Sequence, residues 1–469
     1  MKFITGNQKC AIRNLAIRSF AVLCLFFSAN TPLVSAEADS PMSDLFKRGD
    51  YFITESNPLA TSDQLEMEAL SLRLVETPQV KKAKEIAAMK VRSIVHGRVP
   101  DEAWEAFEQR MDEWTLGYVQ KAVNADPNYP KVLTQIYSGP YEWFGRKMPA
   151  NRAFGGDNPD TIYGLIPVDP YARFRLVGKK FNDKFDAPLQ LCSNLSLSST
   201  LGMISWEDIQ FNDDGTYEVT IDPEPANGRV NHIQSKPEAK FILLRYTRSD
   251  WAAKPIAIRI ERLDPPQAEP RTFEQLADLA ALYVVDDIPA SVYWLTMVDE
   301  LEDNHLKPPF VTGNVGGMRT ARMSYGKLAL KDDDAFVIRV DRAGARFFNL
   351  VLMDYWQDTV DYGQRLTSSN DLQGHPNPDG TTTYVVSKMD PGIHNWIDTA
   401  GLNHPKLMLR WQQLPQDASA KEPSVETQLV SLDKLDSVLP DYVKRITPDE
   451  RKQQLAERLS DHNVRFADH

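Results

Sequence analysis

The stretch from residue 384 to residue 411, YVVSKMDPGIHNWIDTAGLNHPKLMLRW, decides the fold that this sequence predicts. It contains two apolar runs, YVVS and KLMLRW, separated by a loop rich in turn formers and polar residues. Within the loop, Pro391 fixes its own φ and Gly392 accepts a positive φ, so Asp390-Pro391-Gly392 predicts a tight turn. The stretch therefore predicts two β-strands joined by an ordered loop.

Similar runs recur in two regions of the chain, with Gly, Asn, Asp and Pro between them. The region 151–266 contains TIYGLIPV, ARFRLVG, TYEVTID, KFILLRY and AIRIERL, and the region 324–415 contains AFVIRVD, ARFFNLVLMD, TTYVVS and KLMLRWQQL. Short runs that alternate or are apolar throughout are typical of β-strands. Apolar residues at helical spacing instead predict helices in other segments: 62–76, 79–96, 102–123 and 272–303. A final helix is predicted from Thr447, which forms a capping signal with Pro448 and Glu450.

We therefore predict a mainly β protein with a helical N-terminal region and tail, built from antiparallel jelly-roll-like β-sandwich units. The predicted parts are a signal peptide at 1–36, a helical N-terminal region with a connector at 37–150, a first β-sandwich region at 151–266, a helical linker at 267–323, a second β-sandwich region at 324–415 and a polar helical tail at 416–469. A chain of this length can bury a large core, and two or more domains are expected.

The two strand regions are similar to each other in composition and order. Asp214-Gly215-Thr216 in the first region corresponds to Asp379-Gly380-Thr381 in the second. Each is followed by a loop with an asparagine, Asn231 or Asn395, and by an apolar strand with an arginine before an aromatic residue, Arg245-Tyr246 or Arg410-Trp411. The regions are either two related copies or similar by chance, because Asp-Gly turns are common in hairpins. If they are related, the residues that both copies share are structural rather than catalytic.

The N-terminus predicts export from the cytoplasm. Four cations form a positive n-region, an apolar core runs from about Phe20 to Phe27, and Val34-Ser35-Ala36 is a small-residue cleavage site. The apolar run is shorter than the roughly 20 residues that span a bilayer. We therefore expect a periplasmic or secreted protein with no membrane span after cleavage of the signal peptide.

Charge and cysteine content exclude several classes of protein. Removal of residues 1–36 leaves 49 Lys and Arg against 65 Asp and Glu, a formal charge of −16. Such a chain repels phosphate backbones, so nucleic acid is not an expected partner. Cys10 and Cys24 leave with the signal peptide, and Cys192 alone cannot form an intrachain disulfide; it is interpreted as a buried packing residue. The sequence also contains no Gly-x-Ser-x-Gly elbow and no phosphate-binding Gly-rich loop after a strand.

A series of motifs in the second strand region has a known counterpart. The series consists of Tyr355-Trp356, Ser368-Ser369-Asn370, Asp379-Gly380, the segment 390–399 (DPGIHNWIDT) and Arg410-Trp411. It resembles the bacterial family named domain of unknown function twelve-fourteen, and the segment 156–163 (GDNPDTIY) and Asp250-Trp251 are also similar to family members. The resemblance covers roughly residues 150–415. It implies a jelly-roll-like sandwich but no established activity, and His394 stands where a small residue or proline is more usual in the family.

Two loops supply most candidate site residues. In the segment 390–398, Trp396 is either a stacking platform beside ligand-orienting polar groups or the buried plug of a structural corner. In the segment 156–163, Asp160 and Tyr163 either face the same cleft or belong to a simple Asn-Pro turn. The predicted set comprises His394, Asp160 and Tyr163 as catalytic residues, and Asn158, Trp356, Asn395, Trp396, Asp398 and Arg410 as ligand-binding residues.

The histidines form no recognisable ligand motif, so we predict no metal site and assign no cofactor. A metal site remains an alternative for four residues that are close in sequence: His375, Asp379, His394 and His404. His394 with Asn395, Arg410 and a tyrosine such as Tyr384 also has the composition of a β-elimination site, in which His or Tyr removes a proton beside a uronic carboxylate.

The leading hypothesis is an exported protein that recognises, with or without turnover, a small organic or carbohydrate ligand in a cleft between the β-sandwich units. One alternative is a carbohydrate-active lyase or hydrolase. Another is a structural or assembly protein without catalysis, whose sandwich faces form a homo-oligomer. The position of the two loops distinguishes these hypotheses, because a ligand site requires both loops to face one concave pocket.

Overall fold

Helices lie at both ends of the fold and between its two β-rich halves. The computed structural model describes residues 51–136, 139–152, 156, 158–193, 199–312, 320–416 and 421–467. Its helices are α2 (Ser62–Leu74), α3 (Pro78–Ile94), α4 (Asp101–Trp104), α5 (Phe107–Val123), α6 (Phe273–Asp299), α7 (Leu435–Val438) and α8 (Pro448–Asn463), with short 3-10 turns η1 (Trp206–Asp208), η3 (Leu432–Lys434) and η4 (Val464–Phe466). The predicted signal peptide lies outside the described residues.

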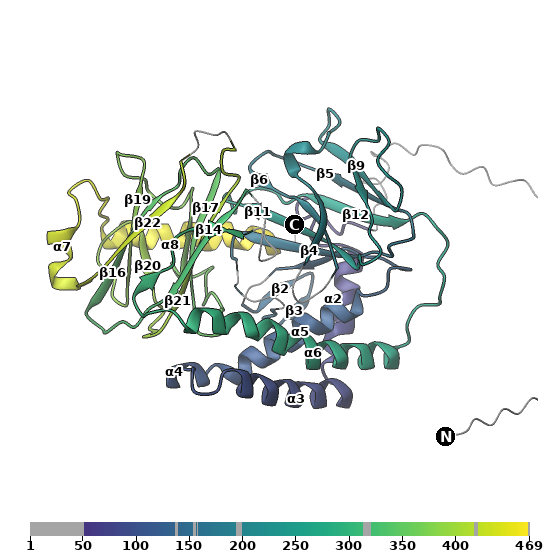
Figure 1. Ribbon diagram of the computed structural model, residues 1–469, viewed down its shortest axis with the longest axis horizontal. Helices are drawn as coiled ribbons and strands as arrows, with labels where there is room; N and C mark the ends of the chain where they lie inside the picture. Colours follow the sequence, from purple (N-terminus) through teal and green to yellow (C-terminus); the bar gives the residue numbers. More distant parts are fainter. Residues whose placement is uncertain are drawn as a thin grey trace, which may run out of the picture. The chain divides into compact units, whose positions relative to one another are not determined.

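The N-terminal helices begin where the sequence supplies capping residues. Thr61 and Thr77 cap α2 and α3, and Thr272 forms a capping box with Gln275 at the start of α6. The predicted helix 102–123 is divided into α4 and α5. Helices α3, α5 and α6 pack against one another and bury a shared apolar cluster (Figure 1). These helices form a separate layer beside the sheets, so the fold is mixed rather than mainly β.

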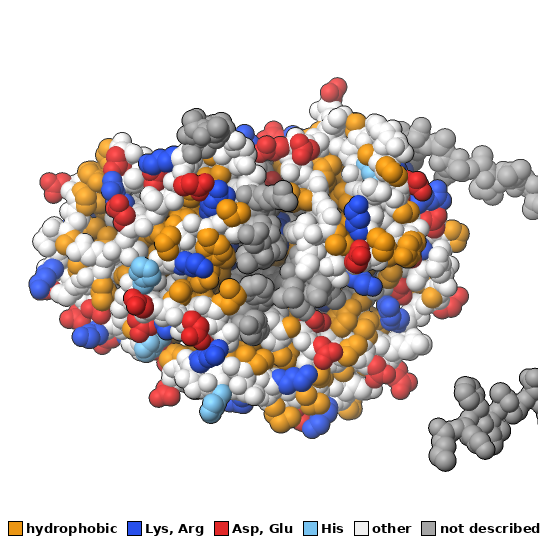
Figure 2. All heavy atoms as spheres, in the orientation of Figure 1, with side chains coloured by type: hydrophobic (Ala, Val, Ile, Leu, Met, Phe, Trp, Pro, Cys, Tyr) orange, Lys and Arg blue, Asp and Glu red, His pale blue; other side chains and the backbone are white. Residues whose placement is uncertain are grey.

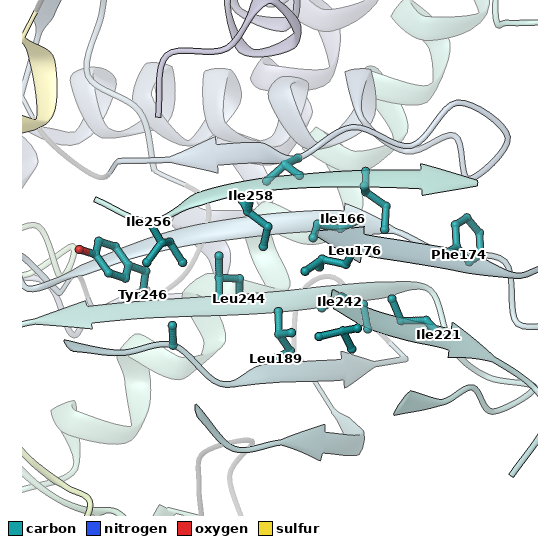
Figure 3. Close-up of a cluster of buried hydrophobic side chains, with 14 of the residues drawn as sticks. Ile166, Phe174, Leu176, Leu189, Ile221, Ile242, Leu244, Tyr246, Ile256 and Ile258 are labelled. Carbon is teal, nitrogen blue, oxygen red and sulfur yellow. The ribbon is translucent and has the colours of Figure 1, made fainter. Parts of the chain in front are cut away.

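The first half of the fold consists of two sheets. Its strands are β1 (Leu133–Gln135), β4 (Thr161–Pro167), β5 (Phe174–Lys179), β6 (Phe185–Asp186), β7 (Leu189–Cys192), β8 (Thr200–Ile204), β9 (Thr216–Asp222), β10 (His232–Gln234), β11 (Phe241–Arg248) and β12 (Ala257–Arg262). One sheet has the order β1-β4-β11-β7-β8, with β6 paired to β11, and the other has the order β10-β9-β5-β12. Apolar side chains from both sheets, such as Leu244 of β11 and Leu176 of β5, meet in one buried cluster (Figure 3). Cys192 is fully buried, as predicted for a packing residue.

The second half also consists of two sheets. Its strands are β13 (His305–Leu306), β14 (Phe310–Val311), β15 (Arg322–Lys327), β16 (Asp334–Asp341), β17 (Phe347–Met353), β18 (Ser368–Asn370), β19 (Thr382–Ser387), β20 (Trp396–Asp398), β21 (Lys406–Gln412) and β22 (Ser424–Ser431). One sheet has the order β13-β15-β21-β17-β18, with β14 paired to β15, and the other has the order β20-β19-β16-β22. A separate hairpin, β2 (Tyr141–Trp143) and β3 (Arg146–Met148), precedes the first half.

The two halves share their strand order. The strands β4, β5 and β7 to β12 correspond in chain order to β15 to β22, and corresponding strands hold the same positions in their sheets. The pairs β9–β10 and β19–β20 are both parallel, although most other pairs are antiparallel. In the first half, Asn212 Nδ2 donates to Thr216 Oγ1 at 2.9 Å and Thr216 Oγ1 donates to Asp214 Oδ1 at 2.6 Å. The second half repeats both hydrogen bonds at the same distances with Asn377, Thr381 and Asp379.

The structure differs from the predicted boundaries in the tail. Residues 424–431, which we expected in a polar helical tail, form β22 and pair with β16 along its whole length. This strand lies at the edge of its sheet, and its side chains are partly or fully exposed. An edge strand of this kind needs no apolar run, so the sequence pattern does not reveal it. The short strand β1 likewise lies in the predicted connector and pairs with β4.

Helix α8 begins at the predicted capping signal and connects the two halves. Thr447 and Glu450 form a capping box, and Pro448 is the first helical residue, as predicted. In Figure 1, α8 runs past the strands of the second half towards the first half. Its Arg451 pairs with Asp390 of the second half at 2.8 Å. In η4, which follows α8 directly, the Arg465 guanidinium donates to the carbonyl of Pro159, next to β4, at 3.4 Å.

The surface carries charges of both signs. On the face shown in Figure 2, acidic and basic side chains are interspersed with apolar ones. Within the described ranges, none of the helices combines the length and apolar character that crossing a bilayer requires.

Candidate functional site

Asp160 lies at the junction of the two halves and is 1 % exposed. Its Oδ1 accepts hydrogen bonds from Trp251 Nε1 at 2.8 Å and Asn370 Nδ2 at 2.7 Å, and its Oδ2 accepts from Asn349 Nδ2 at 2.8 Å. Trp251 belongs to the first half, whereas Asn349 and Asn370 belong to β17 and β18 of the second half. Burial raises the pKa of Asp160, and the three donors together with Arg458 oppose this rise. The carboxyl group therefore joins the halves from a position without access to a ligand.

Asn158 extends the same hydrogen-bond network, whereas Tyr163 lies elsewhere. Asn158 Oδ1 accepts from Asn349 Nδ2 at 2.7 Å, and Asn158 Nδ2 donates to Thr161 Oγ1 at 2.9 Å. The ring of Tyr163 in β4 is buried in a small apolar cluster with residues of α2 and β11, and the guanidinium of Arg245 lies 6.0 Å from its centre. The structure thus brings Asn158 and Asp160 together but does not place Tyr163 beside them in an open cleft.

Asn395 attaches the loop before β20 to a neighbouring loop. Its Oδ1 accepts the backbone N–H of His375 at 2.7 Å, and its Nδ2 donates to the carbonyls of His375 at 2.8 Å and Thr383 at 2.9 Å. In the first half, Asn231 makes the corresponding pair of hydrogen bonds with the backbone of Gln210, both at 2.8 Å. Both amides therefore hold a neighbouring loop by pairing with its backbone N–H and carbonyl. His394 Nδ1 lies 3.0 Å from Asn395 Oδ1.

Trp396 and Asp398 follow in β20 and make local contacts. Trp396 is half-buried, its Nε1 donates to the carbonyl of Ser387 at 3.1 Å, and the Arg451 guanidinium lies 5.2 Å from its ring centre. Asp398 is buried and pairs with Arg365 at 2.5 Å. Because Arg451 covers the Trp396 ring, this loop is held against α8.

Trp356 lies in the helical layer, apart from both candidate loops, whereas Arg410 contacts the start of the segment 156–163. Trp356 does not line a cleft but is 1 % exposed in the helical cluster, where its Nε1 donates to the carbonyl of Ala103 at 2.7 Å. It packs there because the turn after β17 reaches the helical layer, which the strand pattern alone does not reveal. Arg410 in β21 donates from Nη2 to the carbonyl of Gly156 at 3.0 Å, so it connects the halves at a second point.

A cavity of about 700 Å³ lies beside the end of α8. Its walls come from three parts of the chain: residues 139–142 at the β2 hairpin, residues 361–364 in a turn of the second half, and the segment 459–467. None of the nine predicted site residues lines it. The cavity therefore offers a candidate site that the sequence patterns did not indicate.

One wall of the cavity is aromatic and is supported by a buried carboxyl group. The ring of Tyr141 stacks on that of Phe466 with 4.6 Å between ring centres. The Tyr141 hydroxyl donates to Glu68 Oε1 at 3.1 Å, and Glu68 Oε2 accepts from Trp143 Nε1 at 3.0 Å. Glu68 is fully buried, and burial raises its pKa. Glu68, which Trp143 also holds in place, therefore fixes the orientation of Tyr141 at the cavity.

The aromatic lining continues from Phe466 to His462 and Tyr362. The ring centres of His462 and Tyr362 lie 5.3 Å apart, and a Cβ at Gly363 would lie 2.8 Å from the His462 ring, so only glycine permits this approach. Burial and the positive charge of Arg465 lower the pKa of His462 to about 3, which keeps the ring neutral at pH 7. The Tyr362 hydroxyl accepts from Arg465 Nη1 at 3.3 Å.

Buried arginines stand behind this wall. Arg458 and Arg465 lie over the ring of Trp251, with 4.6 and 5.2 Å from guanidinium to ring centre. Arg458 also donates to the carbonyl of Tyr362 at 2.6 Å. Burial lowers the pKa of Arg458 to about 10, and the charge of Asp160 acts in the opposite direction. The inner side of the cavity is therefore the positive side.

The alternative metal site is only partly assembled. The ring centres of His375 and His394 lie 5.7 Å apart. Asp379 instead pairs with Arg339 at 2.6 Å, and His404 lies 3.2 Å from a carboxylate oxygen of Glu102. Among the described residues, no group of three or more His, Cys, Asp and Glu side chains is arranged to bind a metal ion.

The cavity residues gave little signal in the sequence. Tyr141, Tyr362 and His462 come from a connector, a turn and a tail, and no shared motif links these segments. The clearest signal was the amphipathic pattern of the last helix. Its face of apolar and arginine side chains is expected to pack against another part of the molecule.

Comparisons with known proteins concern the fold. No family model matches the chain, so the family resemblance stays a prediction, and no curated protein matches it. The chain is similar to the crystal structure of an uncharacterized protein from Burkholderia cenocepacia, with a TM-score of 0.63 and 22 % identity over 78 % of this chain and 100 % of that chain. It also matches the VPA0106 protein from Vibrio parahaemolyticus, with a TM-score of 0.40 and 12 % identity over 75 % of this chain and 100 % of that chain. The fold of this chain is thus shared with a bacterial protein of solved structure.

Proposed function

We propose that this protein binds a small organic or carbohydrate ligand in the cavity beside the C-terminal helix. The observation that carries the proposal is the wall of that cavity, where Tyr141, Tyr362, His462 and Phe466 surround about 700 Å³. Sites for small molecules have volumes of about 300–1,000 Å³ and combine aromatic surface with a few fixed polar groups. The cavity differs from the predicted cleft between the β-sandwich units, because none of the nine predicted site residues lines it.

The rings are held in place before any ligand arrives. Glu68 fixes the Tyr141 hydroxyl, and Arg465 donates to the Tyr362 hydroxyl. Rigid groups lose little conformational freedom on binding, which favours affinity. Aromatic faces beside such hydroxyls suit the apolar face and polar edge of a sugar ring.

The charges around the cavity guide the choice of ligands to test. Buried arginines lie behind the inner wall, whereas Glu142 and Asp361 are part of the lining. A ligand would match this distribution of charge if its acidic group lay near Arg465 and its neutral polar part lay near Glu142 and Asp361. Uronates and aromatic acids are therefore the first compounds to compare with neutral sugars.

A thermal-shift screen of residues 37–469 tests the proposal. A ligand that binds only the folded protein raises the melting temperature by mass action. The variant Ser460→Trp places a large ring on an exposed cavity-lining position of α8, and Gln453→Trp is the matched control on the same helix away from the lining. We expect Ser460→Trp to abolish the shift and Gln453→Trp to keep it. A ligand that stabilises both variants equally would place the binding site elsewhere.

We further infer that the two halves are related copies of one jelly-roll-like unit in an exported protein. The common strand order and the repeated Asn-x-Asp-Gly-Thr turn support the relation between the halves. The N-terminal charge and cleavage pattern supports export. Fractionation of cells that express the full chain, followed by N-terminal sequencing, tests the latter: a protein that begins at Met1 in the cytoplasm contradicts it.

A further inference from the structure

His375 and His394 form a pair that the proposed ligand cavity does not use. Their ring centres lie 5.7 Å apart, and the ring planes meet at 62°. His375 is exposed and His394 is half-buried, so the pair can be reached from solvent. His375 precedes the turn that leads into β19, and His394 lies directly before Asn395 and β20.

One amide holds the backbone of His375 and contacts the ring of His394. Asn395 accepts from the backbone N–H of His375 and donates to its carbonyl, which fixes the main chain at that position. Because Asn395 Nδ2 donates to two carbonyl oxygens, the atom that faces His394 Nδ1 at 3.0 Å must be the accepting Oδ1. His394 Nδ1 therefore carries the proton, and the lone pair resides on Nε2. A hydrogen bond of this kind is how proteins prepare a metal-binding imidazole.

The distance between the rings suits a shared metal ion. A zinc–nitrogen bond is about 2.0–2.1 Å long, which puts the centre of a bound imidazole about 3.2 Å from the metal. Two such rings at a tetrahedral angle have centres about 5.2 Å apart. The observed 5.7 Å corresponds to a slightly wider angle, and rotation of the exposed His375 ring can close the difference.

The first half provides an internal comparison for the role of these histidines. Asn231 makes the same hydrogen bonds to Gln210 that Asn395 makes to His375. Gln210 and Val230 therefore occupy the places of the two histidines in the first half, and the loop is built there without imidazoles. The hydrogen bonds of this loop therefore do not require an imidazole at either position.

We propose that His375 and His394 together bind one divalent transition-metal ion, such as Zn²⁺, Ni²⁺ or Cu²⁺. Imidazole nitrogens are preferred ligands of these ions. No further His, Cys, Asp or Glu completes a three-residue set among the described residues, so water fills the other coordination positions. Charges of both signs lie near His394. Lys444 and Arg451 are positive, and Glu450 is negative and partly offsets them.

Calorimetric titration with zinc chloride tests this proposal on residues 37–469 without a histidine tag, after treatment with a chelator. The double variant His375→Gln/His394→Val gives the second half the residues of the first half and should fold. His96→Gln removes an exposed histidine elsewhere and is the matched control. We expect one Zn²⁺ per wild-type chain, at least tenfold weaker binding in the double variant, and unchanged binding in His96→Gln. Magnesium chloride should give no binding to any of these proteins, because Mg²⁺ prefers oxygen ligands.

A second measurement keeps the test independent of the double variant. His375→Gln changes an exposed side chain, and the electron paramagnetic resonance spectrum of bound Cu²⁺ reports how many imidazole nitrogens coordinate it. We expect coupling to two imidazoles in the wild type and to one in His375→Gln. Zinc binding that survives in the double variant, or a wild-type chain that takes up no Zn²⁺, overturns the proposal. Either result leaves the ligand cavity beside α8 unaffected, because neither histidine lines it.

Discussion

Replacement of Asp160 tests whether its buried network joins the two halves. In Asp160→Ala, three buried donors lose an acceptor: Trp251 Nε1, Asn349 Nδ2 and Asn370 Nδ2. A buried donor without an acceptor costs about 1–3 kcal/mol, so three cost about 3–9 kcal/mol. Water that enters the space of the lost carboxyl group recovers part of this. We therefore expect Asp160→Ala to lower the free energy of unfolding by about 5 kcal/mol.

Asp160→Asn is the sharper change because it keeps the shape of the side chain. The amide oxygen can still accept from Trp251 and Asn370, but the amide nitrogen then meets the donating nitrogen of Asn349. Rotation of the Asn349 amide does not remove the conflict, because Asn349 Nδ2 also donates to Asn158 Oδ1 at 2.7 Å. One hydrogen bond is lost in either arrangement, so we expect a loss of about 1–3 kcal/mol.

Urea unfolding followed by tryptophan fluorescence and by far-ultraviolet circular dichroism measures both effects. Asp213→Asn, at an exposed position of the first half, is the matched control and should leave the urea midpoint unchanged. The donors come from both halves, so loss of the carboxyl group should weaken the coupling between them. The unfolding curves of Asp160→Ala from fluorescence and from circular dichroism should then no longer coincide. Equal losses in Asp160→Asn and Asp160→Ala, or a loss below about 1 kcal/mol in Asp160→Ala, would refute the reasoning.

Three further predictions concern buried polar groups. Burial raises the pKa of Asp358 above its ordinary value, against the opposing charges of Arg152 and Arg110. The folded state therefore holds this proton more tightly than the unfolded chain, and the free energy of unfolding should fall as the pH rises above the ordinary carboxyl pKa of about 4. Asp358→Asn should weaken this fall in urea titrations at increasing pH, and an unchanged slope contradicts the prediction. Arg451→Ala removes the donor to the carbonyls of Ile393 and His394 and should destabilise the protein by about 1–3 kcal/mol. It should also speed hydrogen exchange in residues 390–396, whereas exposed Lys452→Ala should do neither. Asn231→Ala should lower the free energy of unfolding by about 2–3 kcal/mol, since it removes both hydrogen bonds to the backbone of Gln210. A melting temperature equal to that of the wild type would contradict this role of Asn231.

Local patterns predicted the elements with distinctive residues at their ends. The Thr447 capping box, the Asp-Gly turns and the apolar strands of both halves are present as expected. These signals act over a few residues, so they can be read without the rest of the chain. Strand β22 and strand β1 were missed because their pairing with distant strands, rather than their composition, makes them strands.

The candidate site was harder to predict for a related reason. Asp160, Asn395 and Trp356 have the residue types of a ligand site, yet the fold places all three where their polar groups bond within the protein. The composition of a loop does not reveal whether its polar atoms meet a ligand or another part of the chain. The cavity residues Tyr141 and His462 carry no motif at all.

The sequence by itself determined the turns, the helix caps, the two sets of strands and the predicted export signal, because each depends on neighbouring residues. Only the tertiary structure decided which polar residues are buried between the halves, where a cavity remains and which histidines meet. These properties arise from contacts between segments that are far apart in the chain. Their free energies depend on burial and on hydrogen-bond geometry, which are set only when the two halves, the helices and α8 pack together.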